Sequence, residues 1–342
     1  DSQALGDAGR NPAGYYGAGY GGGVANLGGA LWVIDSTFKG NLARGGDGSV
    51  GPVAGIGGGG ALFNSGYASI EGSRFTRNQA IGGNGCSGAF LTGHGAAGAI
   101  LSGGFATTLL DVRESVFDHN QVIGGDGNQT VAPGGLGPGK ASGGAVDITG
   151  GTGTFSGCTL EHNLSIGGSA LSGGIGSGGG LMVTNVANTG SNATVINSLI
   201  RHNKALGGPG GSGGDGGDGE GGGFTCIQGA TLTVNNTSVE HNHAQGGESG
   251  SGGNGGNGQG GGLFEDAVRS APPLPGPAMS SNLILEGAIV RFNLALAGEA
   301  ADIGFDGTGV GGGVYRLGLY SEGEDTVITK NQADTDNDNV GP

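Results

Sequence analysis

The sequence has few positively charged residues. Lys and Arg together number 13 among 342 residues, against 28 Asp and Glu, and the formal net charge is −15. Recognition of nucleic acid or of an anionic membrane depends on clustered Lys and Arg side chains that neutralise phosphate groups. The sequence shows no such cluster, so we expect no nucleic-acid partner and no binding to a charged lipid surface.

Long apolar runs, helical periodicity and paired cysteines are also missing. No run reaches the ~18 apolar residues that a membrane-spanning helix needs, and no segment places apolar residues at helical spacing over three turns. The three cysteines, Cys86, Cys158 and Cys226, form no CxxC pair and occupy unrelated positions. We therefore predict no membrane span and no disulfide framework, and we expect the three thiols to be free.

Glycine, in contrast, supplies 89 residues. It follows no strict Gly-X-Y register, which excludes a collagen triple helix. Between the glycine tracts lie short segments rich in β-branched residues and bounded by Gly, Asn and Ser, such as ALWVID, ATVINSLI and ATLTVNN. Segments of this kind are typical of β-strands, so the sequence predicts an all-β protein.

One asparagine recurs along the chain. It stands three residues after an apolar residue, it is usually followed by a small residue and a Gly-Gly pair, and it returns at intervals of 37 to 51 residues. A unit of this size cannot bury its own apolar side chains alone, so copies of it must stack on one another. The eight asparagines are Asn41, Asn78, Asn120, Asn163, Asn203, Asn242, Asn293 and Asn331.

Each unit offers two or three short strands separated by turns, which fits one coil of a solenoid. We therefore predict a parallel β-helix of about eight coils over residues 21–333, with strands of adjacent coils ~4.8 Å apart. Residues 1–20 are rich in Gly and Tyr, lack a coil of their own, and are predicted to cap the first coil or to bridge to another molecule. Residues 334–342 are predicted to form an acidic cap. A proline-rich loop at residues 271–277 cannot pair in a sheet.

The repeat motifs resemble those of a known family. The pairs GGALF with FTRN, GAIL with FDHN and GGAV with LEHN match the motifs GGA[I/L/V] and FxxN. These motifs are similar to the repeats of chlamydial-type polymorphic outer-membrane proteins and of related bacterial surface proteins. The resemblance covers residues 21–333. It implies a right-handed parallel β-helix and a surface-exposed adhesin or exoprotein.

The longest glycine loops, residues 207–223 and 246–262, consist mainly of Gly-Gly-X triplets. Three residues per turn is the period of the polyproline II helix, which has no internal hydrogen bonds, so neighbouring glycine segments must bond to one another or to water. Because loops of successive coils emerge at the same corner, we predict that they pack on one side of the β-helix as polyglycine II helices. Flexible surface loops are the alternative.

The eight asparagines are predicted to form a structural ladder. At a tight corner, an amide side chain can bond to its equivalents above and below, and asparagine tolerates left-handed backbone geometry. A catalytic residue is needed once rather than eight times, so no catalytic residue is assigned. Replacing an inner asparagine such as Asn163 with alanine is expected to cost about 1–3 kcal/mol, more than a change at a surface residue such as Lys140.

Acidic residues in one loop are candidate calcium ligands. Asp215, Asp218 and Glu220 lie in GGDGGDGE, which partly matches a calcium-binding nonapeptide repeat. A calcium site needs six to eight oxygen ligands, and the equivalent positions of the next loop are Asn254 and Asn257. The pattern therefore assigns no cofactor, and calcium remains an alternative.

A column of histidines is the second candidate metal site. Each of the four precedes a repeat asparagine, so in consecutive coils the rings should stack on one face, with acidic residues next to three of them. Imidazole with carboxylate suits a transition metal or acid–base chemistry. A plain surface column of stacked rings is the alternative, because a repeat aligns identical side chains without any site. The four are His119, His162, His202 and His241.

Two further functions are weaker alternatives. Many parallel β-helices are polysaccharide lyases or hydrolases, which hold an acidic polymer with clustered basic residues and carboxylates, and the sequence shows no such cluster. Ice binding would need a flat, regular face of Thr or Gly, and the threonines do not align between coils in the sequence. Fold alone does not determine function.

The sequence thus predicts a non-catalytic, extracellular or cell-surface structural protein. The first and last coils of a stack have unpaired strand edges, and a contact between unlike ends extends into a filament. We therefore predict self-association into a fibre by end-to-end stacking. A cell-surface adhesin that binds a cell-surface or matrix polysaccharide is the alternative.

Overall fold

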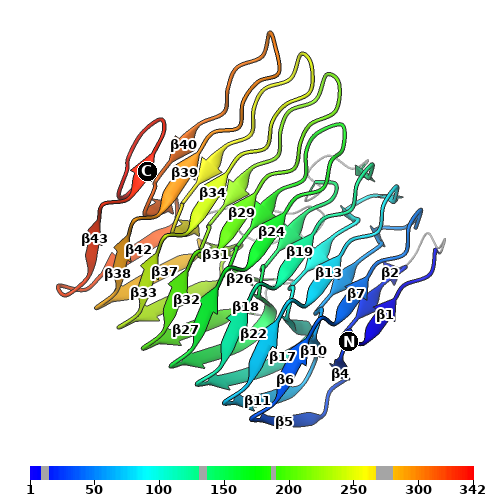
Figure 1. Ribbon diagram of the computed structural model, residues 1–342, viewed down its shortest axis with the longest axis vertical. Helices are drawn as coiled ribbons and strands as arrows, with labels where there is room; N and C mark the ends of the chain where they lie inside the picture. The colour runs from blue at the N-terminus through cyan, green and yellow to red at the C-terminus, as the bar shows by residue number, and fades with distance from the viewer. Residues whose placement is uncertain (9–14, 131–136, 186–189, 267–279) are drawn as a thin grey trace.

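The computed structural model describes residues 1–8, 15–130, 137–185, 190–266 and 280–342 (Figure 1). The predicted proline-rich loop at residues 271–277 and part of the predicted N-terminal segment lie outside these ranges. Every regular element within them is a β-strand, and neighbouring strands pair in parallel. The prediction of an all-β parallel β-helix is confirmed. Two of its sheets are eight strands deep, which gives seven turns between the first and last strands.

Sheet 1 carries two strands of most coils, joined by a turn. In the third and fourth coils the two are continuous as the long strands β17 and β22. The fourteen strands of sheet 1 are β4 (Val24–Asn26), β5 (Ala30–Ile34), β10 (Leu62–Asn64), β11 (Tyr67–Glu71), β17 (Ile100–Arg113), β22 (Val146–Ser156), β26 (Leu181–Thr184), β27 (Asn192–Ile196), β31 (Phe224–Ile227), β32 (Thr231–Asn235), β36 (Leu263–Glu265), β37 (Asn282–Glu286), β41 (Val314–Arg316) and β42 (Leu319–Glu322).

Sheets 2 and 3 follow in each coil and meet at the repeat asparagine. Sheet 2 contains β6 (Thr37–Lys39), β12 (Arg74–Thr76), β18 (Val116–Asp118), β23 (Thr159–Glu161), β28 (Leu199–Arg201), β33 (Ser238–Glu240), β38 (Ile289–Arg291) and β43 (Val327–Thr329). Sheet 3 contains β1 (Gln3–Leu5), β7 (Leu42–Arg44), β13 (Gln79–Ile81), β19 (Gln121–Ile123), β24 (Leu164–Ile166), β29 (Lys204–Leu206), β34 (His243–Gln245), β39 (Leu294–Leu296) and β44 (Gln332–Ala333).

Sheet 4 consists of two-residue strands that return the chain from the glycine loops to sheet 1. Its strands are β3 (Gly19–Tyr20), β9 (Gly57–Gly58), β16 (Gly95–Ala96), β21 (Ala141–Ser142), β25 (Gly176–Ser177), β30 (Gly219–Glu220), β35 (Gly258–Gln259) and β40 (Gly309–Val310). Two small sheets lie in the loops of the first coils, β14 (Ser87–Gly88) with β20 (Gln129–Thr130), and β15 (Leu91–Thr92) with β8 (Val53–Ala54) and β2 (Tyr15–Tyr16).

The apolar core lies between sheets 1 and 2. Alternate residues of each strand point inward, because side chains alternate between the two faces of a strand, and they form columns along the stack. Phe38, Phe75 and Phe117 stack in one such column, with ring centroids 4.8 and 4.9 Å apart. Leu160, Ile200, Val239 and Val290 continue it and are fully buried. These are the apolar residues three positions before the repeat asparagines.

Sheets 3 and 4 pack so closely that the first position of the sheet 4 strands is glycine in every coil except the fourth, where it is Ala141. A Cβ atom on Gly57 would lie 2.1 Å from the Ile81 carbonyl oxygen, and one on Gly176 would lie 2.1 Å from the Leu206 carbonyl oxygen. These oxygens belong to backbone and cannot turn away. The glycines that open each repeat therefore serve close backbone approach rather than flexibility.

The glycine loops extend from sheets 3 and 4, and those of the green to orange coils project furthest (Figure 1). Within residues 207–219, every third N–H group donates to a carbonyl of the next coil. These pairs are Gly207 to Gln245, Gly210 to Glu248, Gly213 to Ser251 and Gly216 to Asn254. Other N–H groups join the limbs of the loops, as Gly208 to Gly174 and Gly217 to Gly208. The loops are thus hydrogen-bonded to one another every three residues, as the period of the Gly-Gly-X triplets requires. The polyglycine II conformation of the loops stays a prediction.

Replacing Gly217 with alanine should disrupt this loop layer. The new Cβ would lie 2.1 Å from the Gly174 carbonyl oxygen, whereas one on Gly211 meets no atom closer than 3.2 Å. Forced overpacking costs about 1–3 kcal/mol, and here the cost falls on the loops rather than on the core. We expect faster amide exchange across residues 207–219 in the Gly217→Ala variant. Equal exchange in Gly217→Ala and the control Gly211→Ala would contradict the close packing.

Threonines align more than the sequence indicates. Thr154, Thr194 and Thr233 pair in register in three consecutive coils on the outer face of sheet 1. The expectation that no threonines align is wrong for these coils, because the three stand nine residues before the repeat asparagines Asn163, Asn203 and Asn242 and share the register of the repeat. The column ends at Asp111 on one side and at Ile284 on the other, so it is three residues long.

The chain covers part of each end of its own stack. At the N-terminal end, β1 pairs with β7 as a ninth strand of sheet 3. At the C-terminal end, Val310 and Val314 bridge to Asp336 and Val340. Of the two arrangements open for the N-terminal segment, the structure has β1 on its own first coil. Within the described residues no helix is long and apolar enough to cross a membrane.

Candidate functional site

The eight repeat asparagines are buried where sheets 2 and 3 meet. From Asn78 onward, each Oδ1 accepts the backbone N–H and the Nδ2 of the asparagine in the preceding coil, and the Nδ2-to-Oδ1 distances are 2.8–3.0 Å. Each Nδ2 from Asn78 onward also donates to a backbone carbonyl of the preceding coil, such as that of Phe117 for Asn163. The backbone of Ser2 donates to Asn41, and Asn331 donates to Asn339. The ladder therefore has partners at both ends.

A second ladder, which sequence reasoning missed, lies at the corner between sheets 1 and 2. Each member stands two positions before the inward-facing apolar residue of sheet 2. A hydroxyl oxygen in one coil accepts a hydrogen bond from the backbone N–H of the ladder residue in the preceding coil, as in Ser36 to Ser73. The signal was present in the sequence as a small residue in the extended motif S-x-F-x-x-N. The members are Ser36, Ser73, Ser115, Cys158, Ser198 and Thr237.

Cys158 thus belongs to a ladder, and all three cysteines are free and buried, as predicted. Burial raises the pKa of Cys158 to about 11, and it also raises the pKa of Cys86. A thiol is reactive as the thiolate. These thiols are therefore held in their inert form at neutral pH.

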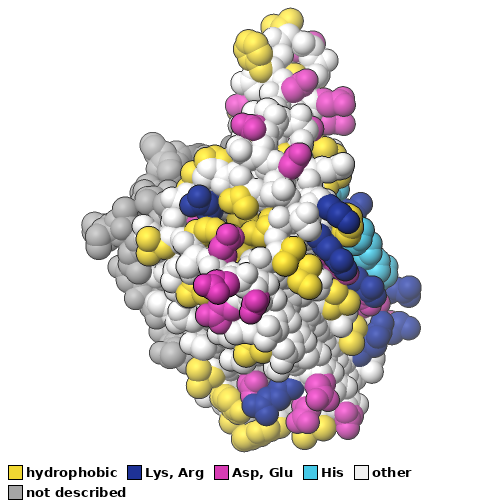
Figure 2. All heavy atoms as spheres, turned by 90° about the vertical axis from the view of Figure 1, so that its left-hand side faces the viewer, with side chains coloured by type: hydrophobic (Ala, Val, Ile, Leu, Met, Phe, Trp, Pro, Cys, Tyr) yellow, Lys and Arg dark blue, Asp and Glu magenta, His cyan; other side chains and the backbone are white. Residues whose placement is uncertain are grey.

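The four predicted histidines form a continuous column on the outer surface. Their φ angles are +54° or +55°, a left-handed corner conformation that is repeated from coil to coil. The ring centroids are 4.8, 5.1 and 5.1 Å apart along the column, and Phe292 extends it by one further ring at 5.0 Å. In Figure 2 the histidines form a row at one edge of the molecule, next to Lys and Arg side chains.

Ion pairs accompany the histidine column on sheet 2. Arg201 donates from Nε and Nη2 to Glu161 Oε2 at 2.9 and 2.7 Å, and Arg291 donates from Nε to Glu240 at 2.9 Å. These carboxylates are therefore engaged by arginine from the next coil. Surface ion pairs of this kind contribute about 0–1 kcal/mol each to the stability of the fold. Their main effect is to hold the carboxylates of Glu161 and Glu240 beside the arginines rather than beside the histidines.

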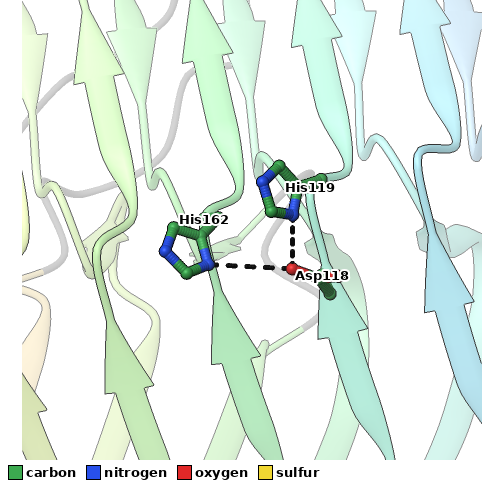
Figure 3. Close-up of side chains that lie close together, drawn as sticks. All are labelled: Asp118, His119 and His162. Atoms are coloured by element: carbon green, nitrogen blue, oxygen red, sulfur yellow. Dashed lines mark hydrogen bonds and ion pairs between the residues drawn. The ribbon is translucent and has the colours of Figure 1, made fainter.

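Asp118 is arranged differently, because two histidines face its carboxylate (Figure 3). Asp118 Oδ1 lies 2.5 Å from His119 Nδ1 and 3.7 Å from His162 Nδ1. Its other oxygen, Oδ2, accepts a bond of 3.0 Å from Arg74 Nη2. One ligand atom from each of Asp118, His119 and His162 lies within 4.8 Å of the other two. Both rings are exposed, while the carboxylate is largely covered.

Stacking also affects protonation within the column. The pKa of His202 is lowered, first by partial burial and then by the neighbouring rings of His162 and His241 and by Arg201. A protonated imidazole would place like charges about one strand spacing apart, which disfavours the charged form. His202 therefore stays neutral at lower pH than an isolated histidine.

The candidate calcium ligands form hydrogen bonds along the loops instead. Asp215 Oδ1 accepts the Asn254 N–H at 2.7 Å, and Asp218 Oδ1 accepts the Asn257 N–H at 2.8 Å. Glu220 is buried and accepts a bond from Ser177 Oγ at 2.9 Å. Among the described residues, the set with metal-ligand spacing is Asp118, His119 and His162 rather than these three acids. The Asp in each triplet thus bonds to the next coil.

A buried polar group lies where sheets 4 and 1 meet. Ser142 Oγ donates to Asp147 Oδ2 at 2.5 Å and lies 2.9 Å from His94 Nε2, and Thr149 donates to Asp147 Oδ1 at 2.7 Å. Lys140 is also here and is 3% exposed. Lys140 is therefore not the surface residue that the sequence suggested, because the packing of sheet 4 encloses it.

This group has the residue types of a hydrolase triad without its geometry. Catalysis requires a histidine that takes the serine proton and is itself oriented by the acid. Here Ser142 gives its proton to Asp147, so His94 donates to the serine oxygen rather than accepting from it. Ser142 is also fully buried. The arrangement joins the third and fourth coils and offers no nucleophile to a substrate.

A shallow open trough lies along the corner between sheets 1 and 2. It runs across four coils and is lined by ladder and corner residues, including Cys158, Asn197, Ser198, Asn236 and Thr237. None of its lining residues is an acid, a base or a histidine. The trough therefore lacks the groups needed for acid–base catalysis.

Comparisons with known proteins identify no family. No family model matches the chain, and no curated protein matches it. Among solved structures, the A-module of the mannuronan C-5 epimerase AlgE4 from Azotobacter vinelandii aligns with 13% identity and a TM-score of 0.20. That alignment covers 92% of this chain and 87% of the epimerase chain. The fluoroquinolone resistance protein QnrB1 aligns with 10% identity and a TM-score of 0.14, covering 88% of this chain and 92% of that one.

These similarities are too low to carry an argument about function. No catalytic family is identified, and no family match supports the resemblance to chlamydial-type repeats. What stands is the coarser statement that the chain is a parallel β-helix built from repeats.

Proposed function

We propose that the protein is a non-catalytic structural component of an extracellular or cell-surface assembly, in which β-helices associate end to end. The observation that carries this proposal is the distribution of exposed large apolar side chains. Most of them lie in the first coil or in the last two. They are Leu5, Leu27, Trp32 and Ile34 at one end, and Ile289, Phe292, Leu317, Leu319 and Val327 at the other.

These side chains accompany unpaired strand edges. Strand β5 ends sheet 1 at the N-terminal end and β42 ends it at the C-terminal end, and β6 and β43 do the same for sheet 2. A second copy placed end to end would continue both sheets. It would also bring the half-buried core residues Leu31 and Phe38 of one copy towards Tyr320 and Ile328 of the other. Burial of apolar surface is the main driving force for such association.

The terminal segments restrict how the ends can meet. Strand β1 occupies part of the next layer over sheet 3, and residues 336–340 occupy part of the next layer over sheets 4 and 1. A second copy cannot approach the edges of β5 and β6 to strand distance while β1 stays in place. Contact through sheets 1 and 2 therefore requires β1 to leave β7 and residues 336–340 to leave the last coil.

A charge at the edge of β42 should block association. Leu319 and Leu109 belong to one column on the outer face of sheet 1, but Leu319 is on the last strand and Leu109 is in the third coil. They are 59% and 47% exposed. Charged residues on edge strands prevent pairing with another chain. We expect Leu319→Lys to reduce the mass of the assembly measured by sedimentation velocity, whereas the control Leu109→Lys should leave that mass unchanged. The measurement is made in about 0.5 M salt, which screens the charge of the acidic C-terminal end.

Deletion of residues 1–5 gives the complementary result. It should strengthen association, because it removes the strand that occupies the next layer. If these residues instead bridge to a neighbour, the deletion yields monomers. A chain that stays monomeric at high concentration both with and without residues 1–5 would rule out end-to-end assembly. An equal effect of Leu109→Lys and Leu319→Lys would place the contact on the side of the stack.

An adhesin is the second candidate, and the glycine loops favour it. Ile303 and Phe305 are 86% and 80% exposed, and Leu171 of an earlier loop is 70% exposed. Figure 2 shows apolar side chains at the tip of the projecting loop layer. Apolar residues on a projection are suited to contact with another surface, such as a matrix polysaccharide. A monomeric chain in the experiment above would favour this function.

A further inference from the structure

We propose that Asp118, His119 and His162 bind one transition-metal ion. The position of the three side chains is set by the fold: Asp118 ends β18, and both histidines occupy the left-handed corner with a φ of +54°. Each coil therefore presents one imidazole at the same place, and the two rings are stacked 4.8 Å apart. In Figure 3 the Nδ1 atoms of both rings face the carboxylate of Asp118.

The distances suit a shared ion. Zn²⁺ binds imidazole nitrogen and carboxylate oxygen at about 2.0–2.2 Å, which places ligand atoms roughly 3–4 Å from one another. His162 Nδ1 is already 3.7 Å from Asp118 Oδ1, whereas His119 Nδ1, at 2.5 Å, must move outward. This movement is open to His119 because its ring is 54% exposed. When the metal takes Nδ1 of neutral His119, the ring carries its proton on Nε2, so the hydrogen bond to Asp118 is replaced by the two bonds to the metal.

Neighbouring interactions single out this position on the column. Glu161 and Glu240 are bound by arginines of the next coil. Each arginine holds only Oε2 of its glutamate, as Arg74 holds only Oδ2 of Asp118. What distinguishes Asp118 is that its other oxygen, Oδ1, is directed at two histidines. Arg74 also orients the carboxylate, as outer partners of metal ligands commonly do.

The donor set selects the class of metal. Two imidazole nitrogens and one carboxylate oxygen suit Zn²⁺, Co²⁺, Ni²⁺ or Cu²⁺, whereas Ca²⁺ and Mg²⁺ take oxygen ligands. Three protein ligands leave further coordination positions for water. This site is independent of end-to-end assembly, because it lies on the side of the stack in the third and fourth coils.

Titration of the full-length protein with Co²⁺ tests the site, because visible absorption reports the ligands around cobalt. We expect one saturable site in the wild type. Asp118→Asn and His162→Asn should each weaken binding by about 10–100-fold or more. His241→Asn is the matched control, since His241 has the same backbone conformation and ring stacking but belongs to no group with metal-ligand spacing among the described residues. Asparagine tolerates the left-handed corner, so these histidine variants should fold.

Two results would overturn the proposal. One is the absence of saturable Co²⁺ binding by the wild type, with Zn²⁺ calorimetry giving the same answer. The other is equal loss of binding in His162→Asn and His241→Asn, which would mean that any pair of stacked rings holds the ion. Thermal unfolding of each variant separates loss of the site from loss of the fold.

Discussion

Replacing Asn163 with alanine should lower the free energy of unfolding by about 3–5 kcal/mol, because an orphaned buried polar group costs about 1–3 kcal/mol. Asn163 is 1% exposed, and its side chain takes part in four hydrogen bonds. The change leaves the buried N–H of Asn120 and the buried carbonyl of Phe117 without these partners. The expected loss exceeds the value from sequence alone, since each ladder residue serves the coils on both sides.

Asn192→Ala is the matched control for this experiment. Asn192 lies at the start of β27 in the same coil as Asn203 and is exposed. We expect it to change the free energy of unfolding by no more than about 0.5 kcal/mol, as is usual for surface positions. Urea unfolding followed by circular dichroism measures both changes. Similar midpoints for the two variants would show that the ladder does not stabilise the stack.

Acidification should destabilise the protein through two histidines. The pKa of His94 is lowered to about 3, by burial first and then by Lys140, and the pKa of His243 is lowered to about 4, by burial first and then by Lys204. In the unfolded chain both groups titrate near 6.5. Below that pH the unfolded state binds more protons than the folded state, so stability present above pH 6.5 is lost as the pH falls towards 4 and 3.

The expected loss of unfolding free energy is on the order of 2 kcal/mol for each histidine at pH 4. One unit of pKa difference corresponds to about 1.4 kcal/mol, and the partial access of both rings to solvent reduces the total.

Glu265 acts in the opposite direction. Burial is the main cause that raises the pKa of Glu265 to about 7. Since the folded state holds that proton more tightly, Glu265 contributes stability below about pH 4.5 that is lost as the pH rises through 7.

Variants separate these opposing contributions. The double variant His94→Gln/His243→Gln does not titrate at these positions, and glutamine at position 94 can still bond to Ser142. Between pH 7 and pH 4, the wild type should lose about 2–4 kcal/mol more than the double variant, as measured by urea unfolding at each pH. Parallel curves of stability against pH for the two proteins would contradict the burial of these imidazoles in neutral form.

The sequence by itself determined the stacked β-helix and its corners. Every coil has a buried corner, an inward-facing apolar position and a position where two backbones approach closely. Because each of these positions favours one residue type, the same residues return in the sequence at the same spacing. The Asn ladder, the column of histidines and the need for glycine were readable for this reason. The second ladder was readable too, since Ser36, Ser73 and Ser115 stand at a constant distance before the inward phenylalanines.

Tertiary structure alone decided which side chains meet between coils. The sequence placed an acid beside three of the histidines, yet only the packing directed Asp118 at two rings and assigned Glu161 and Glu240 to arginines. It also buried Lys140 and laid β1 over the first coil. Such contacts join residues about 40 positions apart through turns of unequal length. The repeat fixes the register of these contacts, but which neighbour a long side chain reaches depends on its rotamer and on the side chains of both adjacent coils, which no local pattern specifies.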